Sequence, residues 1–264
     1  MGLLRQALKP CYLFWKYPEY RAYLRVQRVC RKASNRSVTV WLNGFVIEGN
    51  DGPSLLHQYE EIIRRKSFDF TTSTEQPVIY CCGANIGLEV MHLEQLYPQA
   101  KIKAYEPDIE LFSVLISNIE RNESKAVAVN AAVYTSAGQL QFASDGKLGG
   151  KLGEGLASVQ TIRLRDELAK ETHIDLLIMD IEGCETEVLK DCSDQLSKVG
   201  SIFVEWHSDQ NKVQSLQEVL QLLQSAGFRY RLNNNLGEAP FLNPVVENGF
   251  DAMVEIYATR APKA

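Results

Sequence analysis

From residue 77 onward, short uninterrupted apolar segments alternate with segments of helical periodicity. The apolar segments cover residues 78–82, 102–105, 126–129, 174–179 and 202–204. An uninterrupted apolar run is typical of a strand buried on both faces, and such strands occur in parallel sheets covered by helices on both sides. The alternation therefore predicts a doubly wound α/β fold.

The end of the chain departs from this alternation. Residues 228–232 and 252–258 both have strand composition, and the residues between them show no helical pattern. Two parallel neighbours need a crossover connection that is normally helical. A helix-free connection therefore predicts an antiparallel C-terminal strand pair on a mostly parallel sheet.

Residues 1–75 are expected to form a small appendage to a main domain at residues 76–264. After a basic helix, strand-rich sequence flanks Asn43-Gly44, a dipeptide favoured in type I′ turns, which predicts a β-hairpin over 38–48. A helix is expected over 54–66, with apolar residues repeating along one side. The appendage contains no chemical motif.

Charge is unevenly distributed along the chain. The net charge is -5, yet residues 1–36 hold nine Lys or Arg and a single acid, Glu19. A basic helix interleaved with Leu, Phe and Trp can contact an anionic membrane surface, or pack its apolar side on its own acidic body. Both interpretations stay open. The acidic remainder argues against nucleic-acid binding.

The six cysteines include no CxxC pair and no zinc-type spacing with histidine, so we assign no metal ligands from them. Free cysteines are typical of a reducing compartment. We expect a cytoplasmic protein, with peripheral contact at the inner membrane surface as the alternative for the basic segment. The oligomeric state is left open.

The first apolar strand leads into Cys82-Gly83-Ala84-Asn85-Ile86-Gly87. A glycine at a strand end permits a sharp turn and the close approach of a ligand, and the second glycine lets the following helix begin near the sheet. The free N–H groups of that helix suit an anionic or polar ligand. Such glycine pairs also serve packing alone.

The second strand ends at Glu106-Pro107. An acid at this tip can accept hydrogen bonds from both ribose hydroxyls of a nucleoside cofactor, at a spacing from Gly83 that one βαβ unit sets. Glu106 could instead cap the helix expected to begin at Pro107. Because Gly83 and Gly87 accompany it, we favour the ribose role.

Polar residues also follow the later strands. Asn130, Ala131 and Ala132 follow the third strand and suit the edge of an adenine ring, or an ordinary turn. Ligands of open α/β sheets bind at the carboxyl ends of the strands. The fourth and fifth strands place these residues at that edge: Asp180, Glu182, Glu205 and His207.

The order and spacing of four segments resemble those of the FkbM-like S-adenosylmethionine-dependent methyltransferases. The segments are Gly83 to Gly87, Glu106-Pro107, residues 180–185 and Glu205. The resemblance covers residues 78–205 and implies a Rossmann-like methyltransferase fold. It also implies methyl transfer from S-adenosylmethionine to a hydroxyl of a sugar, glycolipid or natural product. The expected cofactor-binding residues are Cys82, Gly83, Ala84, Asn85, Gly87, Glu106, Pro107, Asn130, Ala131, Ala132 and Asp180.

Methylation of an alcohol requires alignment of the nucleophile with the donor and an acceptor for its proton. We expect His207 to be the base and rank Asp180 as the second candidate. Glu182 and Glu205 are expected to orient the substrate or the base. Asp180 and Glu182 could alternatively hold a divalent cation. The glycine-rich loop 144–155 is expected to be either a lid over the substrate or an ordinary connection.

Two other functions are compatible with parts of the sequence. Cys81 stands where the family has an acid that helps hold the methionine end of the cofactor, Ile178 replaces a frequent lysine, and Arg165 replaces an aspartate. These departures leave open a non-catalytic binding protein with the same fold. An NAD-dependent oxidoreductase is less favoured for two reasons. Asn85 stands where the dinucleotide motif G-x-G-x-x-G has its middle glycine. The antiparallel strand pair predicted at the end of this sheet is typical of methyltransferases and is absent from most dehydrogenases.

Overall fold

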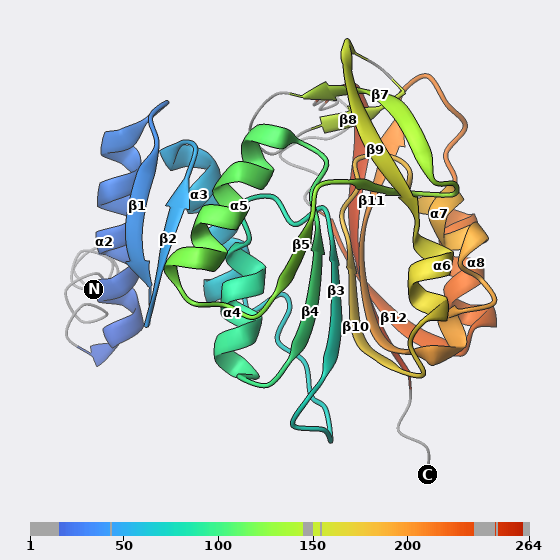
Figure 1. Ribbon diagram of the computed structural model, residues 1–264, viewed down its shortest axis with the longest axis horizontal. Coiled ribbons are helices and arrows are strands. Elements are labelled where there is room, and N and C mark those ends of the chain that lie inside the picture. The colour runs from blue at the N-terminus through green and yellow to red at the C-terminus, as the bar shows by residue number, and fades with distance from the viewer. Residues whose placement is uncertain are drawn as a thin grey trace, which may run out of the picture.

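The N-terminal part of the molecule is a helix, a hairpin and a second helix (Figure 1). In the computed structural model the described residues are 16–42, 44–144, 150–153, 155–234, 246 and 248–260. The elements are α2 (Pro18–Ala33), β1 (Val38–Leu42), β2 (Phe45–Gly49), α3 (Gly52–Gln58) and the π-helical turn η1 (Tyr59–Arg64). The predicted hairpin is confirmed, with Leu42 opposite Phe45. The side chain of Asp51 caps α3 by accepting the N–H of Ser54 at 2.9 Å.

A seven-stranded sheet forms the centre of the molecule, in the order β12-β13-β11-β10-β3-β4-β5. Each predicted apolar run is one of its parallel strands. These are β3 (Val78–Cys82), β4 (Lys101–Tyr105), β5 (Val127–Val129), β10 (Ile174–Met179) and β11 (Val199–Asp209). The predicted mostly parallel sheet is therefore confirmed.

The sheet ends in the expected antiparallel arrangement. Strand β12 (Phe228–Asn233) lies at the edge, and β13 (Phe250–Arg260) lies between it and β11. Strand β13 is antiparallel to both neighbours. Because β13 pairs with β11 as far as Asp209, β11 continues well beyond the run predicted from its apolar residues.

Helices cover both faces of the sheet (Figure 1). One face carries α4 (Leu88–Leu96) and α5 (Ile109–Arg121). The other face carries α6 (Leu164–Ala169), α7 (Glu185–Asp191) and α8 (Leu216–Ser225). A short 3-10 helix, η2 (Leu196–Lys198), precedes β11. Two hydrophobic cores result, and the neighbours Cys81 and Cys82 belong to different ones, as the alternation of a strand requires.

The N-terminal elements share a core with the α4 and α5 side of the sheet. Val26, Cys30 and Ile47 belong to the same buried cluster as Leu115. Helix α5 also binds the hairpin backbone: Asn118 accepts the N–H of Glu48 at 2.9 Å and donates to its carbonyl at 2.9 Å. These bonds pair the backbone N–H and carbonyl of Glu48 on the outer edge of β2, which would otherwise be unpaired there.

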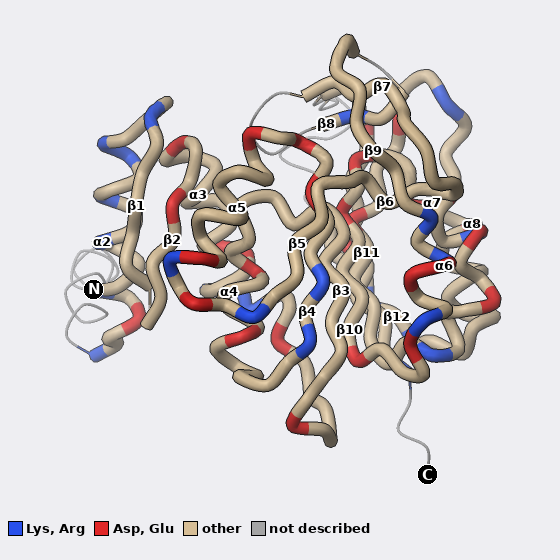
Figure 2. The backbone as a smooth tube through the Cα atoms, in the orientation of Figure 1, with Lys and Arg blue, Asp and Glu red and all other residues tan. Residues whose placement is uncertain are grey.

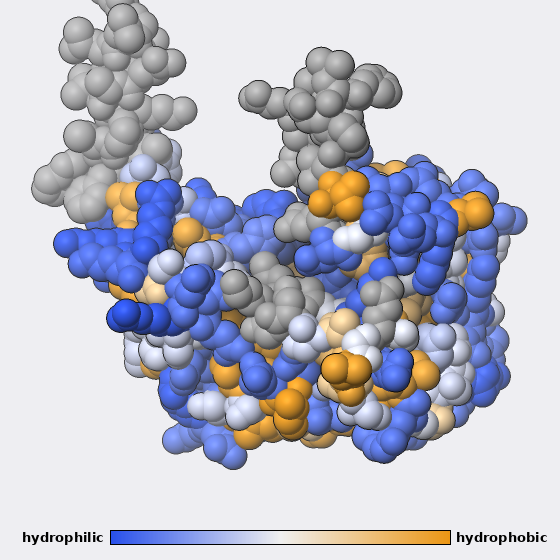
Figure 3. Space-filling view, turned by 90° about the horizontal axis from the view of Figure 1, so that it is seen from above, coloured by the Kyte–Doolittle hydropathy of each residue, from blue (hydrophilic) through white to orange (hydrophobic). Residues whose placement is uncertain are grey.

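Basic residues lie along α2, at one end of the molecule (Figure 2), and the surface at that end is largely hydrophilic (Figure 3). Arg25, Arg28, Arg31 and Lys32 are exposed, whereas Val26 and Cys30 are buried. This helix thus packs its apolar side on its own chain, while contact of residues 1–36 with a membrane stays a prediction. Within the described residues, none of the helices is long and apolar enough to cross a membrane.

A small four-stranded sheet, in the order β6-β9-β7-β8, lies above the central sheet in Figure 1. Its strands are β6 (Ala132–Tyr134), β7 (Gly138–Ser144), β8 (Gly150–Leu152) and β9 (Ala157–Arg163). The sequence pattern did not predict this sheet. The segment 144–155, expected to be a lid or a connection, includes β8, which pairs with β7; residues 145–149 and 154 lie outside the described residues.

Candidate functional site

A cavity of about 740 Å³ opens at the carboxyl ends of the parallel strands. That volume lies within the range of small-molecule sites. Its walls come from α3, η1, the loops after β3, β4 and β10, the small sheet, and β13. All four expected catalytic residues line the cavity: Asp180, Glu182, Glu205 and His207. Seven of the expected cofactor residues line it as well: Gly83, Asn85, Glu106, Pro107, Ala131, Ala132 and Asp180.

The two glycines after β3 are required by close packing. Gly83 has φ +85°, and a Cβ there would overlap the carbonyl oxygen of Asp180. Gly87 has φ +81°, and a Cβ there would overlap the Leu115 side chain of α5. Both positions therefore admit only glycine. The group that approaches Gly83 is the backbone at the end of β10, which brings Asp180 beside the first loop.

Glu106 joins this loop to the end of β4. One carboxylate oxygen accepts the N–H of Asn85 at 2.8 Å, and the other accepts the N–H of Asp108 at 2.8 Å. The sequence left open that Glu106 caps a helix beginning at Pro107. In the structure α5 begins at Ile109, and its N-terminal cap is Asp108. Each oxygen of Glu106 keeps a further lone pair for a ligand. Burial raises the pKa of Glu106 to about 7.

Four of the expected cofactor residues do not line the cavity: Cys82, Ala84, Gly87 and Asn130. Cys82 and Ala84 are fully buried. The Asn130 side chain donates to the carbonyl oxygens of Glu106 at 2.8 Å and Pro107 at 3.1 Å. In the structure these residues support the loops that carry the lining.

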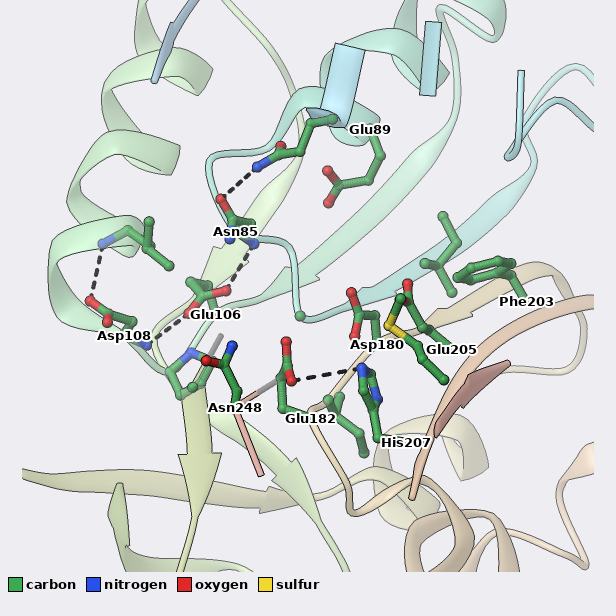
Figure 4. A pocket seen from close by; sticks show the side chains of 18 of the residues that line it. Asn85, Glu89, Glu106, Asp108, Asp180, Glu182, Phe203, Glu205, His207 and Asn248 are labelled. Atoms are coloured by element: carbon green, nitrogen blue, oxygen red, sulfur yellow. Dashed lines mark hydrogen bonds and ion pairs between the residues drawn. The ribbon is translucent and has the colours of Figure 1, made fainter. Parts of the chain in front are cut away.

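His207 lies within β11, where a buried carboxylate orients it. Its Nδ1 is 3.1 Å from Oε1 of Glu185, which is 1% exposed and also accepts the N–H of Gly183 at 2.9 Å. Its Nε2 is 3.7 Å from Oε2 of Glu182 (Figure 4). One ring nitrogen thus faces a buried partner and the other faces the cavity.

Electrostatics set the protonation of this cluster. Burial alone would lower the pKa of His207, but the Glu185, Asp180 and Glu182 carboxylates outweigh burial and raise that pKa to about 10. Burial and the nearby charge of Asp180 raise the pKa of Glu205 to about 9. Burial raises the pKa of Asp180 as well. At neutral pH His207 and Glu205 are therefore protonated, and the pKa of Asp180 beside them is raised.

Glu185 was given no role by the sequence. Together with Asp180 and His207 it forms a group whose potential metal-ligand atoms lie within 4.8 Å of one another. Its Oε1 is already engaged by His207 and by Gly183, so we assign Glu185 to positioning His207 and make no metal assignment. Its position as the first residue of α7, close behind Asp180 and Glu182, was the available signal.

Elements without a recognised motif supply further lining residues. Gln58 and Glu61 come from the N-terminal part, and Glu89 from the first turn of α4. Phe142 and Leu152 come from the small sheet. No spacing rule predicted these contacts, because they depend on how α3 and the small sheet pack over the strand ends.

The three departures from the family pattern occupy different environments. Cys81 is buried outside the cavity lining, close enough to Glu89 for that charge to act on the thiol. Ile178 is buried and lines the cavity. Arg165 is half-exposed, away from the cavity lining, and pairs with Asp194 at 2.6 Å. Of the three positions, Ile178 alone lines the cavity and can contact a bound ligand directly.

The strand order, the inserted antiparallel β13 and a cavity beside a glycine turn define a Rossmann-like methyltransferase fold. Sequence comparison assigns the family: the model of the methyltransferase FkbM domain matches residues 82–230. The chain therefore belongs to the FkbM methyltransferase domain family.

Curated relatives agree with this family. Methyltransferase sdnD of Sordaria araneosa is 31% identical over 172 residues, covering 50% of this chain and 66% of the relative. The hexuronic acid methyltransferase AglP of Haloferax volcanii is 29% identical over 143 residues, covering 51% of this chain and 57% of the relative. The chain thus spans somewhat more than half the length of these two proteins.

A crystal structure of a methyltransferase FkbM from Methylobacillus flagellatus supports the same fold. It superposes with a TM-score of 0.51 at 14% identity, covering 90% of this chain and 53% of that one. At this identity the likeness concerns the fold.

Proposed function

We propose that this protein is an S-adenosylmethionine-dependent O-methyltransferase acting on a hydroxyl of a sugar, a glycolipid or a natural product. The observation that carries the proposal is one cavity in which the glycine turn and Glu106 face Asp180, Glu205 and His207. Family membership supports methyl transfer, and the relative named for a hexuronic acid supports a sugar acceptor.

The cavity suits a positively charged nucleoside cofactor. Its described lining contains eight acidic residues and no Lys or Arg: Glu61, Glu89, Glu106, Asp108, Asp180, Glu182, Glu205 and Asp251. Oδ1 of Asp180 is buried and has no hydrogen-bond partner. Sulfonium and ammonium groups would compensate this negative surface. We assign Glu106 to the ribose hydroxyls, and Ala131 and Ala132 to the adenine edge.

When bound, S-adenosylmethionine supplies a methyl carbon that its positive sulfonium makes electrophilic. The protein then aligns the acceptor hydroxyl and takes its proton. Because His207 is protonated at neutral pH, we place Asp180, whose raised pKa makes its ionised carboxylate a stronger base, before His207 as the base. His207 orients the acceptor through its Nε2 hydrogen, and Glu185 holds the ring in place.

Calorimetry with S-adenosylmethionine, S-adenosylhomocysteine and NAD tests the cofactor. We expect the first two to bind and NAD to give no heat. NAD binding alone would support an oxidoreductase, and no binding at all would support a non-catalytic protein. Transfer of a labelled methyl group to a panel of uronic acids, glycolipids and polyols then tests the acceptor. Labelling of peptides or amines alone would exclude O-methylation.

A further inference from the structure

Unsatisfied acceptors gather in the cavity. Among the described residues, five buried side-chain oxygens lack a hydrogen-bond partner, and three of them belong to residues that line this cavity: Gln58 Oε1, Glu89 Oε1 and Asp180 Oδ1. A buried acceptor without a donor costs about 1–3 kcal/mol, so native proteins rarely keep one unless a ligand fills the need. A matching ligand must therefore donate hydrogen bonds.

The orientation of Gln58 follows from its neighbours. Oδ1 of Asn85 accepts the N–H of Ile86 at 2.9 Å and the Nε2 of Gln58 at 3.0 Å. Because Asn85 presents its oxygen, Gln58 must present its NH₂ group there, which leaves Gln58 Oε1 as the unused acceptor. Gln58 is 7% exposed, so its free oxygen is available only within the cavity wall.

Glu89 is the charged member of this pair. It lies in the first turn of α4, is 5% exposed, and directs its carboxylate into the cavity on the side of Asp180 (Figure 4). Burial first, and then the charges of Glu106 and Glu61, raise the pKa of Glu89 to about 8. A buried carboxylate surrounded by other acids, with no Lys or Arg in the described lining, is suited to a cationic ligand group.

The neighbouring strand lacks this charge. Cys81, two residues before Gly83, carries a buried thiol whose pKa is raised well above its usual value by burial and by the charge of Glu89. The thiol stays neutral. The negative charge at this end of the cavity is therefore supplied by α4 instead of β3.

We propose that Glu89, assisted by Gln58, binds the α-ammonium group of the amino-acid tail of S-adenosylmethionine. The proposal rests on the proposed function. An ammonium group has three N–H donors, enough to supply one to Glu89 Oε1 and one to Gln58 Oε1. The Glu89 carboxylate compensates its charge. Gln58 belongs to the N-terminal part, so residues outside the matched family domain complete the cofactor site.

Ligands with and without the tail test this assignment. We expect Glu89→Gln to weaken S-adenosylmethionine and S-adenosylhomocysteine by about 10- to 150-fold in calorimetry, as for a lost charged hydrogen bond. Binding of 5′-methylthioadenosine, which has no amino-acid tail, stays unchanged. Gln58→Met should show the same tail-dependent loss at smaller size. Glu110→Gln, at the first turn of α5 and outside the lining, is the matched control.

Stability separates binding from a structural role. The ligand-free Glu89→Gln variant should melt at the same temperature as the parent protein or higher, because the buried amide never carries a charge, whereas Glu89 ionises as pH passes its pKa of about 8. An equal loss for all three ligands, no loss for any, or a lower melting temperature would overturn the role of Glu89. If the parent protein binds neither S-adenosylmethionine nor S-adenosylhomocysteine, the proposed function itself fails.

Discussion

At the scale of the residue, the site depends on a small number of buried charged groups. Glu185 is held by the N–H of Gly183 and faces His207, which in turn reaches toward Glu182 in the cavity. An imidazole held on one side by a buried carboxylate keeps a defined orientation for the other nitrogen. The protonation of this chain of groups decides which of them can accept a proton from a substrate.

Replacement of Glu185 by Gln should lower the pKa of His207 from about 10, because the largest favourable charge beside the imidazolium is lost. Nitrogen chemical shifts of the His207 ring, followed against pH, measure this change. Asp191→Gln, in the same helix and outside the cavity lining, serves as the control. A His207 pKa that stays the same in Glu185→Gln would show that Glu185 does not position the ring.

Asp180→Asn should lower kcat about 100-fold or more, as expected for the loss of a general base. In the parent protein kcat should rise with pH, because the raised pKa of Asp180 leaves this base increasingly ionised as pH increases. The variant should lose this rise. Rates with the acceptor found by the methyl-transfer screen measure both effects, and Asp166→Asn on the surface is the control. A pH-dependent rise that persists in Asp180→Asn would assign the proton to another group.

At the scale of the element, the docking of α3 and the hairpin matters most. Asn118 of α5 is fully buried and makes hydrogen bonds to Glu48 on β2 and to the carbonyl of Ile86 in the first loop. One side chain thus connects the hairpin to the loop that carries the cofactor site. The hairpin and α3 share their core with α4 and α5, so Gln58 and Glu61 are held against the cavity.

Asn118→Ala should destabilise the protein by about 3 kcal/mol, because three hydrogen bonds are lost and buried backbone groups are left unpaired. For a domain of this size such a loss lowers the melting temperature by roughly 6–12 °C. Chemical and thermal unfolding measure it, with exposed Asn211→Ala as the control. A change within 0.5 kcal/mol, the usual range for a surface substitution, would contradict this role of Asn118.

At the scale of the whole molecule, ligand-free stability should fall as pH rises from about 5 to 9. Burial raises the pKa of Glu106 to about 7, of Glu89 to about 8 and of Glu205 to about 9, from an ordinary value of 4.5. A carboxyl with a raised folded pKa stabilises the protein below its unfolded pKa, and that contribution is lost as pH passes the folded value. The raised pKa of His207 acts in the same direction.

Urea unfolding at pH 5.5, 7 and 9 measures this dependence. Saturating S-adenosylhomocysteine should stabilise the protein more at pH 9 than at pH 5.5, because its ammonium group then faces ionised carboxylates. Ligand-free stability that increases toward pH 9 would show that these groups are ionised and compensated in the folded protein.

The sequence alone predicted the parallel sheet, the antiparallel end and the hairpin, because the periodicities of strands and helices are local properties of the chain. It also predicted that Gly83, Glu106, Asp180 and His207 lie at one edge, since parallel strands end on the same side of a sheet. Only the tertiary structure brought Gln58, Glu89 and Glu185 to that edge. Their positions depend on the packing of α3 against α2 and β2 and on the turns that start α4 and α7. Long-range packing leaves no periodic signal in a single sequence.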